Sequence, residues 1–259
     1  MQRENITSND SLNVRLTANR EFGSLDFHRW VFQNYKFAPG MDVLDVGCGN
    51  GVQALEALRV MGSNGSVSAV DLSPPAVAQL TATANGAPNL QAIVGDMREL
   101  GTSISETFKV KKYDLAHSTY ALYYAGEHVK VLEAMRKALK PDGRMIVTTP
   151  IGPNTLRQLV NRLGYPTPEL AQIDNFNSAV LEPYFRSFFN HIDIQIRRNV
   201  LKLPTTDAVA TLYRSTAYYL PEAEAGVLRL ARAEIESKGF FAFEKNAYMI
   251  IGSGHAWSD

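Results

Sequence analysis

The sequence has little cysteine, no net charge and no long hydrophobic run. Cys48 is the only cysteine among 259 residues, so neither an intrachain disulfide nor a cysteine-based zinc site can form. The 26 basic residues balance 26 acidic ones, which argues against binding to a phosphate backbone, because such binding depends on clustered Lys and Arg. No stretch of about 18 apolar residues occurs, so we expect no membrane-spanning helix.

Three further expectations follow from these absences. The segment from Met1 to Asp10 is polar and lacks the apolar core of a secretory signal. Together with the single cysteine, this indicates a reducing compartment, and we expect a cytoplasmic protein. We also expect small, uncharged partners, with no nucleic acid, no membrane and no bound metal.

Between Met41 and Pro150 short apolar runs alternate with helix-like segments, which is typical of a parallel sheet with crossover helices. Apolar residues at helical spacing follow the first run, from Ala54 to Met61, and precede the last one, from Val131 to Leu139. The predicted strands are Asp42–Val46, Val67–Asp71, Leu90–Val94, Tyr113–Ala116 and Arg144–Thr149.

After Pro150 the pattern changes to longer helical segments with two extended runs. An amphipathic helix is also expected before the sheet, around Phe27 to Tyr35. The predicted later helices are Asn154–Leu163, Ser178–Phe189, Thr205–Leu220 and Glu222–Lys238, and the predicted later strands are His191–Leu203 and Phe240–Ile251.

A glycine-rich loop runs from Asp45 to Gly51, where the first predicted strand meets the first crossover helix. Such junctions present backbone N–H groups at the carboxyl edge of the sheet, where open α/β proteins bind ligands. A dinucleotide fingerprint needs Gly-x-Gly-x-x-Gly, and Val52 stands where the last glycine would complete it from Gly47. The loop therefore disfavours a nicotinamide or flavin enzyme. A tight turn without a ligand is the alternative.

Two acidic residues follow the next strands. Asp71 ends the second predicted strand, a position from which a carboxylate can bind both hydroxyls of a ribose. It could instead cap the helix that begins at Ser73 and Pro74. Asp96 and Met97 follow the third strand and could bind an exocyclic amine and a purine face. These positions describe an adenosine site without a pyrophosphate cradle.

These motifs resemble those of the class I S-adenosylmethionine-dependent methyltransferases. The resemblance covers roughly Phe27 to Pro150 and is closest to the bacterial UbiE-like group, which acts on small molecules. Members of that group often carry His where this chain has Tyr120 and Tyr124. The residues that carry the resemblance are Asp45-Val46-Gly47-Cys48-Gly49-Asn50-Gly51, Asp71, Gly95-Asp96-Met97, the strand Tyr113-Asp114-Leu115-Ala116 with Tyr120 to Tyr124, and the turn Leu139 to Arg144.

The resemblance implies a Rossmann-like α/β fold, with a seven-stranded, mostly parallel sheet whose last strand is antiparallel. It implies one methyltransferase domain over residues 1–259, with a cofactor-binding core at 19–150. Residues 151–190 and 204–238 are then expected as helical cap insertions over the acceptor site. The resemblance implies that Gly47, Gly49 and Gly51 line the methionine end of S-adenosylmethionine and that Asp45 faces its ammonium through water or a backbone group. Asp71 is then expected at the ribose, Asp96 and Met97 at the adenine, and His117 at the methionine moiety. Cys48 and Leu72 are also expected among the cofactor-binding residues.

The implied reaction is an in-line displacement in which an O, N or C atom of a small-molecule acceptor attacks the sulfonium methyl. For a hydroxyl acceptor, His117 or Tyr120 could act as base, although His117 could equally be a structural histidine. Tyr120 and Tyr124 are expected in the acceptor pocket, with Tyr218 or Tyr219 from a cap helix. Arg15 or Arg20 could close over the cofactor carboxylate.

Three alternatives remain at this point. The chain could methylate RNA or protein, although Arg197-Arg198 with Lys202 is a short basic cluster. It could bind the cofactor without turnover. It could be an oxidoreductase, which Val52 disfavours. We expect a monomer or a homodimer.

Overall fold

The computed structural model describes residues 8–167 and 171–255, which form two compact units. The sheet unit consists of residues 31–149, 176–195 and 248–255. The helical unit consists of the described residues among 1–30, 150–175 and 196–247.

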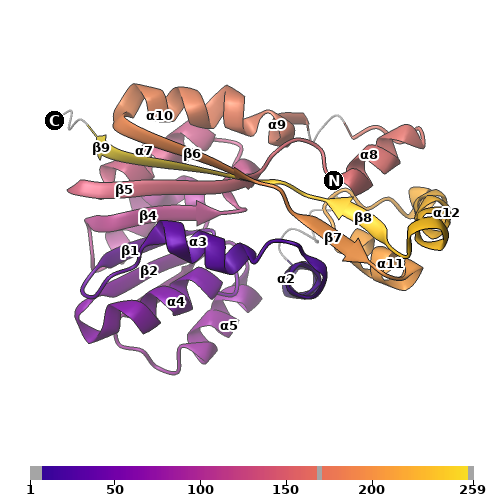
Figure 1. Ribbon diagram of the computed structural model, residues 1–259. Helices are drawn as coiled ribbons and strands as arrows, with labels where there is room; N and C mark the ends of the chain where they lie inside the picture. The colour runs from indigo at the N-terminus through magenta and orange to yellow at the C-terminus, as the bar shows by residue number, and fades with distance from the viewer. Residues whose placement is uncertain (1–7, 168–170, 256–259) are drawn as a thin grey trace. The chain divides into compact units, whose positions relative to one another are not determined.

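The sheet unit is built on seven strands in the order β3-β2-β1-β4-β5-β9-β6 (Figure 1). The pairs β1–β2, β2–β3, β1–β4 and β4–β5 are parallel, and Figure 1 shows β9 ending at the side where β6 begins. The prediction of a seven-stranded, mostly parallel sheet is confirmed. The strands are β1 (Asp42–Val46), β2 (Ser66–Asp71), β3 (Leu90–Val94), β4 (Tyr113–Thr119), β5 (Leu139–Pro150), β6 (Phe189–Arg197) and β9 (Ala247–His255).

Helices flank both faces of this sheet (Figure 1). The helix α4 contacts β1 and β2, α5 contacts β2 and β3, and α7 contacts β4. Their apolar faces are buried as the spacing predicts, because the residues at positions i, i+3 and i+7 share one side of a helix. The helices are α3 (Phe27–Tyr35), α4 (Val52–Met61), α5 (Pro74–Thr83), α6 (Ser105–Thr107), α7 (His128–Lys137) and α10 (Glu182–Phe188), with short helical turns at Gly62–Asn64, Met97–Glu99, Leu100–Ile104, Leu122–Tyr124 and Asn177–Leu181.

The strand order reverses between β1 and β4, because β2 and β3 lie on one side of β1 and β5 lies beyond β4. In open α/β sheets, ligands bind outside the carboxyl ends of the strands at such a switch point. The fold therefore places the candidate site after Val46 and Thr119.

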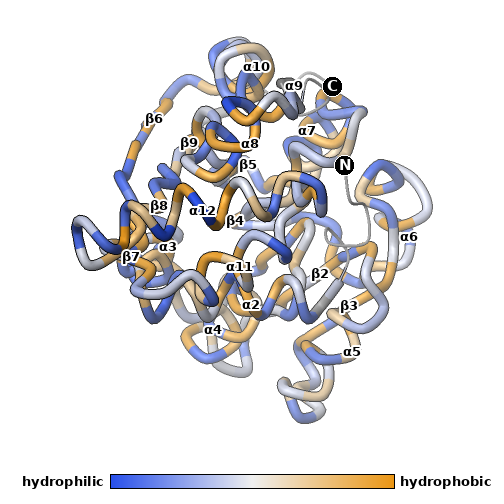
Figure 2. Tube along the Cα trace, turned by 90° about the vertical axis from the view of Figure 1, so that its right-hand side faces the viewer, coloured by the Kyte–Doolittle hydropathy of each residue, from blue (hydrophilic) through white to orange (hydrophobic). Residues whose placement is uncertain are grey.

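The helical unit has its own hydrophobic core, formed by helices packed on a two-stranded ribbon. Leu156, Val209, Tyr213, Val227 and Phe241 are among its buried side chains. Figure 2 shows hydrophobic and hydrophilic residues alternating along α11 and α12, as expected of helices with one buried face. The elements are α2 (Asn9–Phe22), α8 (Thr155–Arg162), α9 (Ala171–Asp174), β7 (Val200–Leu203), α11 (Thr206–Arg214), α12 (Pro221–Lys238) and β8 (Phe241–Glu244), with β7 and β8 antiparallel.

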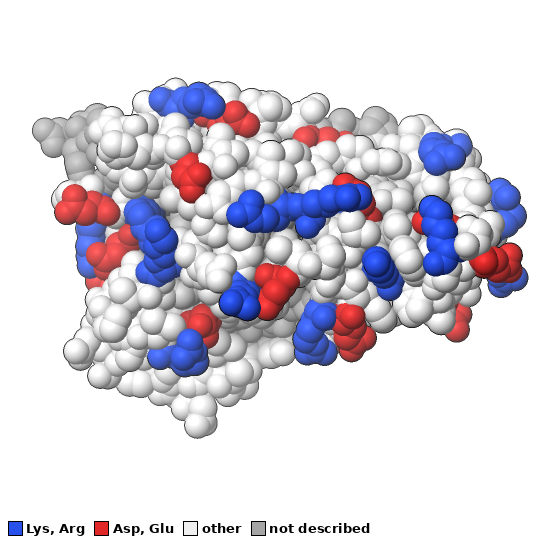
Figure 3. Space-filling view, in the orientation of Figure 1, with Lys and Arg blue, Asp and Glu red and all other residues white. Residues whose placement is uncertain are grey.

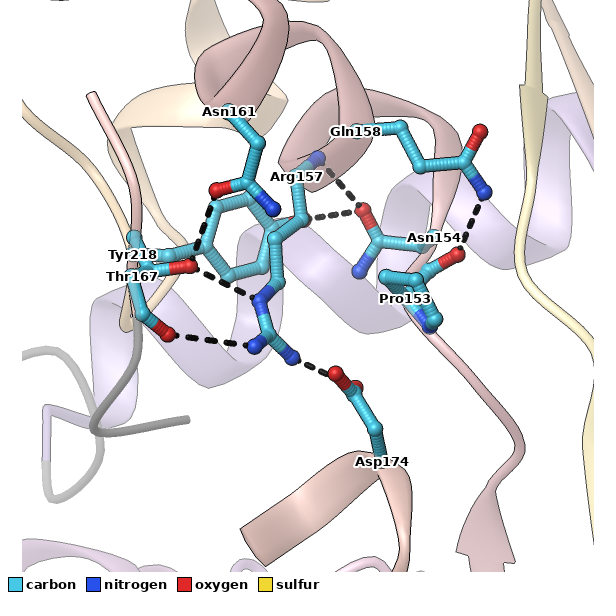
Figure 4. A network of polar contacts seen from close by, with 8 residues as sticks. All are labelled: Pro153, Asn154, Arg157, Gln158, Asn161, Thr167, Asp174 and Tyr218. Atoms are coloured by element: carbon cyan, nitrogen blue, oxygen red, sulfur yellow. Dashed lines mark hydrogen bonds and ion pairs between the residues drawn. The ribbon is translucent and has the colours of Figure 1, made fainter. Parts of the chain in front are cut away.

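A buried arginine ties α8 to the segment that follows it (Figure 4). Arg157 is 6% exposed. Its Nε donates to Thr167 Oγ1 at 2.9 Å, a terminal nitrogen donates to the Thr167 carbonyl at 3.2 Å, and the other pairs with Asp174. Asn161 Oδ1 accepts from the Thr167 hydroxyl at 3.2 Å. All three side-chain nitrogens of Arg157 therefore have partners.

Two of the predicted strands are interrupted. The run His191–Leu203 is divided into β6 and β7, and Phe240–Ile251 is divided into β8 and β9. At the break, Asn246 Oδ1 accepts from the backbone N–H of Asn199, and Asn199 Oδ1 accepts from Leu25 N. Because the Asn246 side chain accepts from the Asn199 N–H in place of a backbone carbonyl, the regular ladder is interrupted there.

Residues 176–190, which we expected in a cap insertion, belong to the sheet unit. They contain the predicted helix Ser178–Phe189 as the turn Asn177–Leu181 followed by α10. The predicted helix Thr205–Leu220 ends at Arg214, where the Ser215 and Thr216 hydroxyls donate to carbonyls of its last turn. The role of the remaining insertions as a cap over the acceptor stays a prediction.

Candidate functional site

The glycine-rich loop leaves β1 in a conformation that only glycine adopts easily. Gly47, Gly49 and Gly51 have φ angles of +76°, +54° and +83°, in the region that side chains disfavour. The N–H groups of Gly47 and Cys48 donate to the Val70 carbonyl at 2.8 and 3.1 Å. The loop is thereby held against the end of β2.

The loop is also too closely packed for side chains at two of its glycines. A Cβ atom added to Gly47 would lie 2.2 Å from Cβ of Ala121 and 3.4 Å from the methyl carbon of Met97. One added to Gly51 would lie 2.3 Å from a methyl carbon of Leu80. The loop, Met97 and the segment after β4 are therefore immediate neighbours, as the predicted site requires.

Asp71 connects the loop to the start of α5. One carboxylate oxygen accepts from Gly49 N at 2.8 Å and the other from Ser73 N at 2.9 Å. Since each oxygen has a second lone pair, both can still accept a hydroxyl donor. The next side chain, Leu72, is 57% exposed. The geometry is compatible with the ribose role and with local stabilisation of the turn.

Asp96 is engaged by a residue that the sequence analysis did not single out. Its carboxylate accepts from the backbone N–H of Arg98 and pairs with the Arg98 guanidinium. These hydrogen bonds hold the pKa of Asp96 below its ordinary value, so the carboxylate stays an acceptor. An arginine two residues after an acidic cap residue is the local signal that could have revealed this pair.

Asp45 and His117 lie opposite each other as register partners on β1 and β4. Their side chains are 1% and 0% exposed, and Asp45 Oδ1 lies 3.5 Å from His117 Nδ1. Burial, reinforced by the charge of Asp71, raises the pKa of Asp45 well above its ordinary value. Burial lowers the pKa of His117 to about 3, so the imidazole is neutral at pH 7.

Tyr120 follows β4 with a φ of +56°, which is uncommon for a non-glycine residue and costs backbone strain. Its N–H donates to the Thr148 carbonyl at 2.8 Å, which holds this conformation. Burial raises the pKa of its hydroxyl above the ordinary value. Tyr124 is 38% exposed, and its ring centroid lies 4.4 Å from that of Tyr123.

The remaining candidates are placed as follows. The Cys48 thiol is buried and burial raises its pKa, which disfavours a thiolate nucleophile. In the helical unit, Arg15 donates to the Ser215 carbonyl and Arg20 lies 3.8 Å from Glu21. Tyr218 donates to Asn154 Oδ1 at 2.8 Å.

Two features are absent from the described residues, 8–167 and 171–255. They contain no group of three or more His, Cys, Asp or Glu side chains arranged to hold a metal ion. None of their helices combines the length and the apolar character that crossing a bilayer needs.

Comparisons with known proteins agree on one family. A family model described as "Methyltransferase domain" matches residues 37–203. The chain is 31% identical over 120 residues to nocamycin O-methyltransferase of Saccharothrix syringae, covering 46% of this chain and 41% of that protein. It is 30% identical over 114 residues to aklanonic acid methyltransferase DauC of Streptomyces sp. strain C5, covering 43% and 49%. The matched segment thus spans less than half of either relative.

A similar fold occurs in the crystal structure of a SAM-dependent methyltransferase from Geobacter sulfurreducens in complex with S-adenosyl-L-homocysteine. The two share 14% identity and a TM-score of 0.52, over 93% of this chain and 98% of that one. At this identity the likeness concerns the fold. The family model covers more than half of the sequence, and the chain therefore belongs to the methyltransferase domain family.

Proposed function

We propose that the protein binds S-adenosylmethionine and transfers its methyl group to a small-molecule acceptor. The observation that carries this proposal is the buried carboxylate of Asp45 behind the glycine loop. Its Oδ2 has no hydrogen-bond partner among the described residues. A buried acceptor of this kind fits the ammonium of the cofactor, because a cationic donor both satisfies the oxygen and stabilises its ionised form.

The other site residues fit the rest of the cofactor. Gly47 and Gly51 let the loop take its positive φ angles and pack against Ala121 and Leu80, which fixes the loop beside Asp71. Asp71 retains lone pairs for the ribose hydroxyls, and the exposed Leu72 offers an apolar surface beside it. Asp96 offers a charged acceptor to the adenine amine, and Met97 lies beside the loop where it can contact the purine face.

Bound S-adenosylmethionine supplies a methyl group on a positively charged sulfur. The chain's own contribution is orientation, which can supply on the order of 7–11 kcal/mol when two reactants are held in line. Tyr120 keeps its proton at neutral pH, because burial raises its pKa, and it therefore acts as a hydrogen-bond donor. We place Tyr120 and Tyr124 at the acceptor, where Tyr124 presents exposed aromatic surface.

Names of relatives and surface charge support a small-molecule acceptor. The two curated relatives are named for nocamycin and aklanonic acid. On the face that Figure 3 shows, basic and acidic side chains are interspersed, and the described residues there form no broad basic patch of the kind that nucleic acids need. The UbiE-like subgroup, the cytoplasmic location and the monomeric or homodimeric state stay predictions.

The direct test of the function is incubation of the protein with methyl-labelled S-adenosylmethionine and a fractionated cell extract. The proposal expects label in the small-molecule fraction, with none from an Asp45→Asn variant. Label confined to RNA or protein would overturn the acceptor class. Tight binding of the cofactor without transfer to any fraction would favour a binding module instead.

A further inference from the structure

The pair formed by Asp45 and His117 is buried but incompletely hydrogen bonded. Asp45 Oδ2 and both ring nitrogens of His117 have no hydrogen-bond partner among the described residues. Asp45 Oδ1 and His117 Nδ1 are 3.5 Å apart, slightly beyond the usual length of a hydrogen bond. Since unpaired buried polar atoms destabilise a fold, a ligand that supplies a hydrogen-bond partner would stabilise this pair.

Aromatic rings enclose the imidazole on the side of α3. The ring of Tyr35 lies 4.6 Å from that of His117, and the ring of Phe37 lies 6.4 Å from it. The Tyr35 hydroxyl is hydrogen bonded to Thr119, two residues further along β4. His117 is 0% exposed and packs against these two rings. Its neighbour across the strands, Asp45, is the group through which it can act.

The other titratable groups that face Asp45 cannot stabilise its negative charge. Asp71 from the end of β2 repels it. The Cys48 thiol in the loop and the Tyr35 hydroxyl on α3 are both neutral, and the charge of Asp45 contributes to raising their pKa values. The neutral imidazole of His117 remains as the hydrogen-bond donor beside Oδ1.

We propose that His117 is a positioning residue that donates its Nδ1–H to Oδ1 of ionised Asp45, which leaves Oδ2 to accept from the cofactor's ammonium. This inference rests on the proposed function. Binding then replaces the proton of Asp45 by the ammonium, and the proton leaves to solvent. Affinity must consequently fall at low pH, where Asp45 is protonated, and His117 sets where that fall begins.

The test is a calorimetric titration of the full chain with S-adenosylhomocysteine between pH 6 and 9. His117→Leu keeps apolar bulk but removes the donor, and should weaken affinity roughly 10- to 100-fold at pH 7. It should also move the pH of half-maximal affinity upward. His117→Asn, whose amide N–H can take the place of Nδ1–H, should restore most of the affinity and the original pH profile.

The matched control is Ser118→Ala. Ser118 is the next residue on β4 and is equally buried, but successive side chains of a strand point to opposite faces. Its hydroxyl also lacks a partner among the described residues. This variant should bind with wild-type affinity at every pH, which separates the pair from the general effect of deleting a buried polar group.

Each other outcome is informative. Wild-type affinity of His117→Leu across the pH range, with weak binding by Asp45→Asn, overturns the role of His117 and leaves the proposed function standing. Wild-type affinity of Asp45→Asn overturns the proposed ammonium site itself. If His117→Leu loses the same affinity at every pH and His117→Asn does not restore it, His117 acts through packing alone, which also overturns the proposal. If His117→Leu does not fold, His117→Gln replaces it, since its amide lies at the Nε2 position, away from Asp45.

Discussion

The two units each contain a buried polar cluster, and the clusters differ in how completely they are hydrogen bonded. In the helical unit, Arg157 uses its three side-chain nitrogens on Thr167 and Asp174 (Figure 4). In the sheet unit, Asp45 and His117 keep three polar atoms without partners among the described residues. A satisfied cluster stabilises one conformation. An unsatisfied one is retained where a ligand completes it.

The largest expected effect concerns the satisfied cluster. Arg157→Ala leaves Asp174 without its cation and removes the link to Thr167, and breaking a buried pair in this way costs about 3–5 kcal/mol. Chemical denaturation measures the loss of unfolding free energy. The matched control in the same unit is Arg198→Ala, since Arg198 is 75% exposed and pairs with Glu244 at 3.0 Å; its stability should stay close to wild type. Equal losses in both variants would contradict the comparison.

Substitutions of two glycines separate the effect of backbone strain at a positive φ from the effect of close packing in the glycine-rich loop. Gly47→Ala meets both a positive φ and the contact with Ala121, and should lower stability by about 1–3 kcal/mol and abolish binding of S-adenosylhomocysteine. Gly40→Ala has a similar φ of +78° with no atom within 4 Å of the added Cβ. It should lose some stability but keep its affinity, as equilibrium dialysis would show. Near-native binding by Gly47→Ala would mean that the loop does not contact the ligand.

Substitution of Asp71 tests whether a carboxylate that already accepts two backbone hydrogen bonds also binds the cofactor. Asp71→Ala should weaken affinity for S-adenosylhomocysteine roughly 10- to 100-fold, because it removes hydrogen bonds to the ribose. Asp71→Asn keeps one acceptor oxygen and should show a smaller loss. Calorimetry measures both, and circular dichroism confirms the fold. Unchanged affinity in a folded Asp71→Ala variant would assign Asp71 to the turn alone.

The smallest expected effect is on the way the stability of the ligand-free protein depends on pH. A raised Asp45 pKa makes stability fall as pH rises above about 4. A His117 pKa of about 3 makes stability fall as pH drops below about 6.5. Between these limits the two effects on stability oppose each other.

Single variants should expose each effect. Asp45→Asn should gain stability as pH rises from 5 to 6, relative to wild type, and His117→Leu should lose it. Thermal unfolding at matched pH values measures both. Parallel curves for the two variants would show that the pair does not titrate as its burial implies.

Local pattern was sufficient to predict the first part of the sheet. β1 and β3 have the predicted bounds, and β2 differs by one residue, because short apolar runs between turn signals are determined locally. The glycine loop was recognisable for the same reason, since three closely spaced glycines after a strand satisfy a backbone requirement that sequence shows directly.

Features that depend on distant residues were missed. The break between β6 and β7 depends on Asn199 contacting Asn246, which lies 47 positions further along the chain. Arg157 lies in a predicted helix, and nothing in the sequence around it indicates that its side chain is buried and paired with Asp174. The helix α2 was not expected, because its sequence is polar and its buried Ala18 packs in the core of the helical unit. The positive φ of Tyr120 follows from tertiary packing, which a single sequence does not display.

A crystal structure of the protein with S-adenosylhomocysteine tests the role of the Asp45–His117 pair most directly. We expect the ammonium within hydrogen-bonding distance of Asp45 Oδ2, with the distance between His117 Nδ1 and Asp45 Oδ1 shortened below its present 3.5 Å. An ammonium bound elsewhere, with Asp45 and His117 unchanged, would contradict the claim that the unsatisfied pair in the sheet unit exists for the ligand.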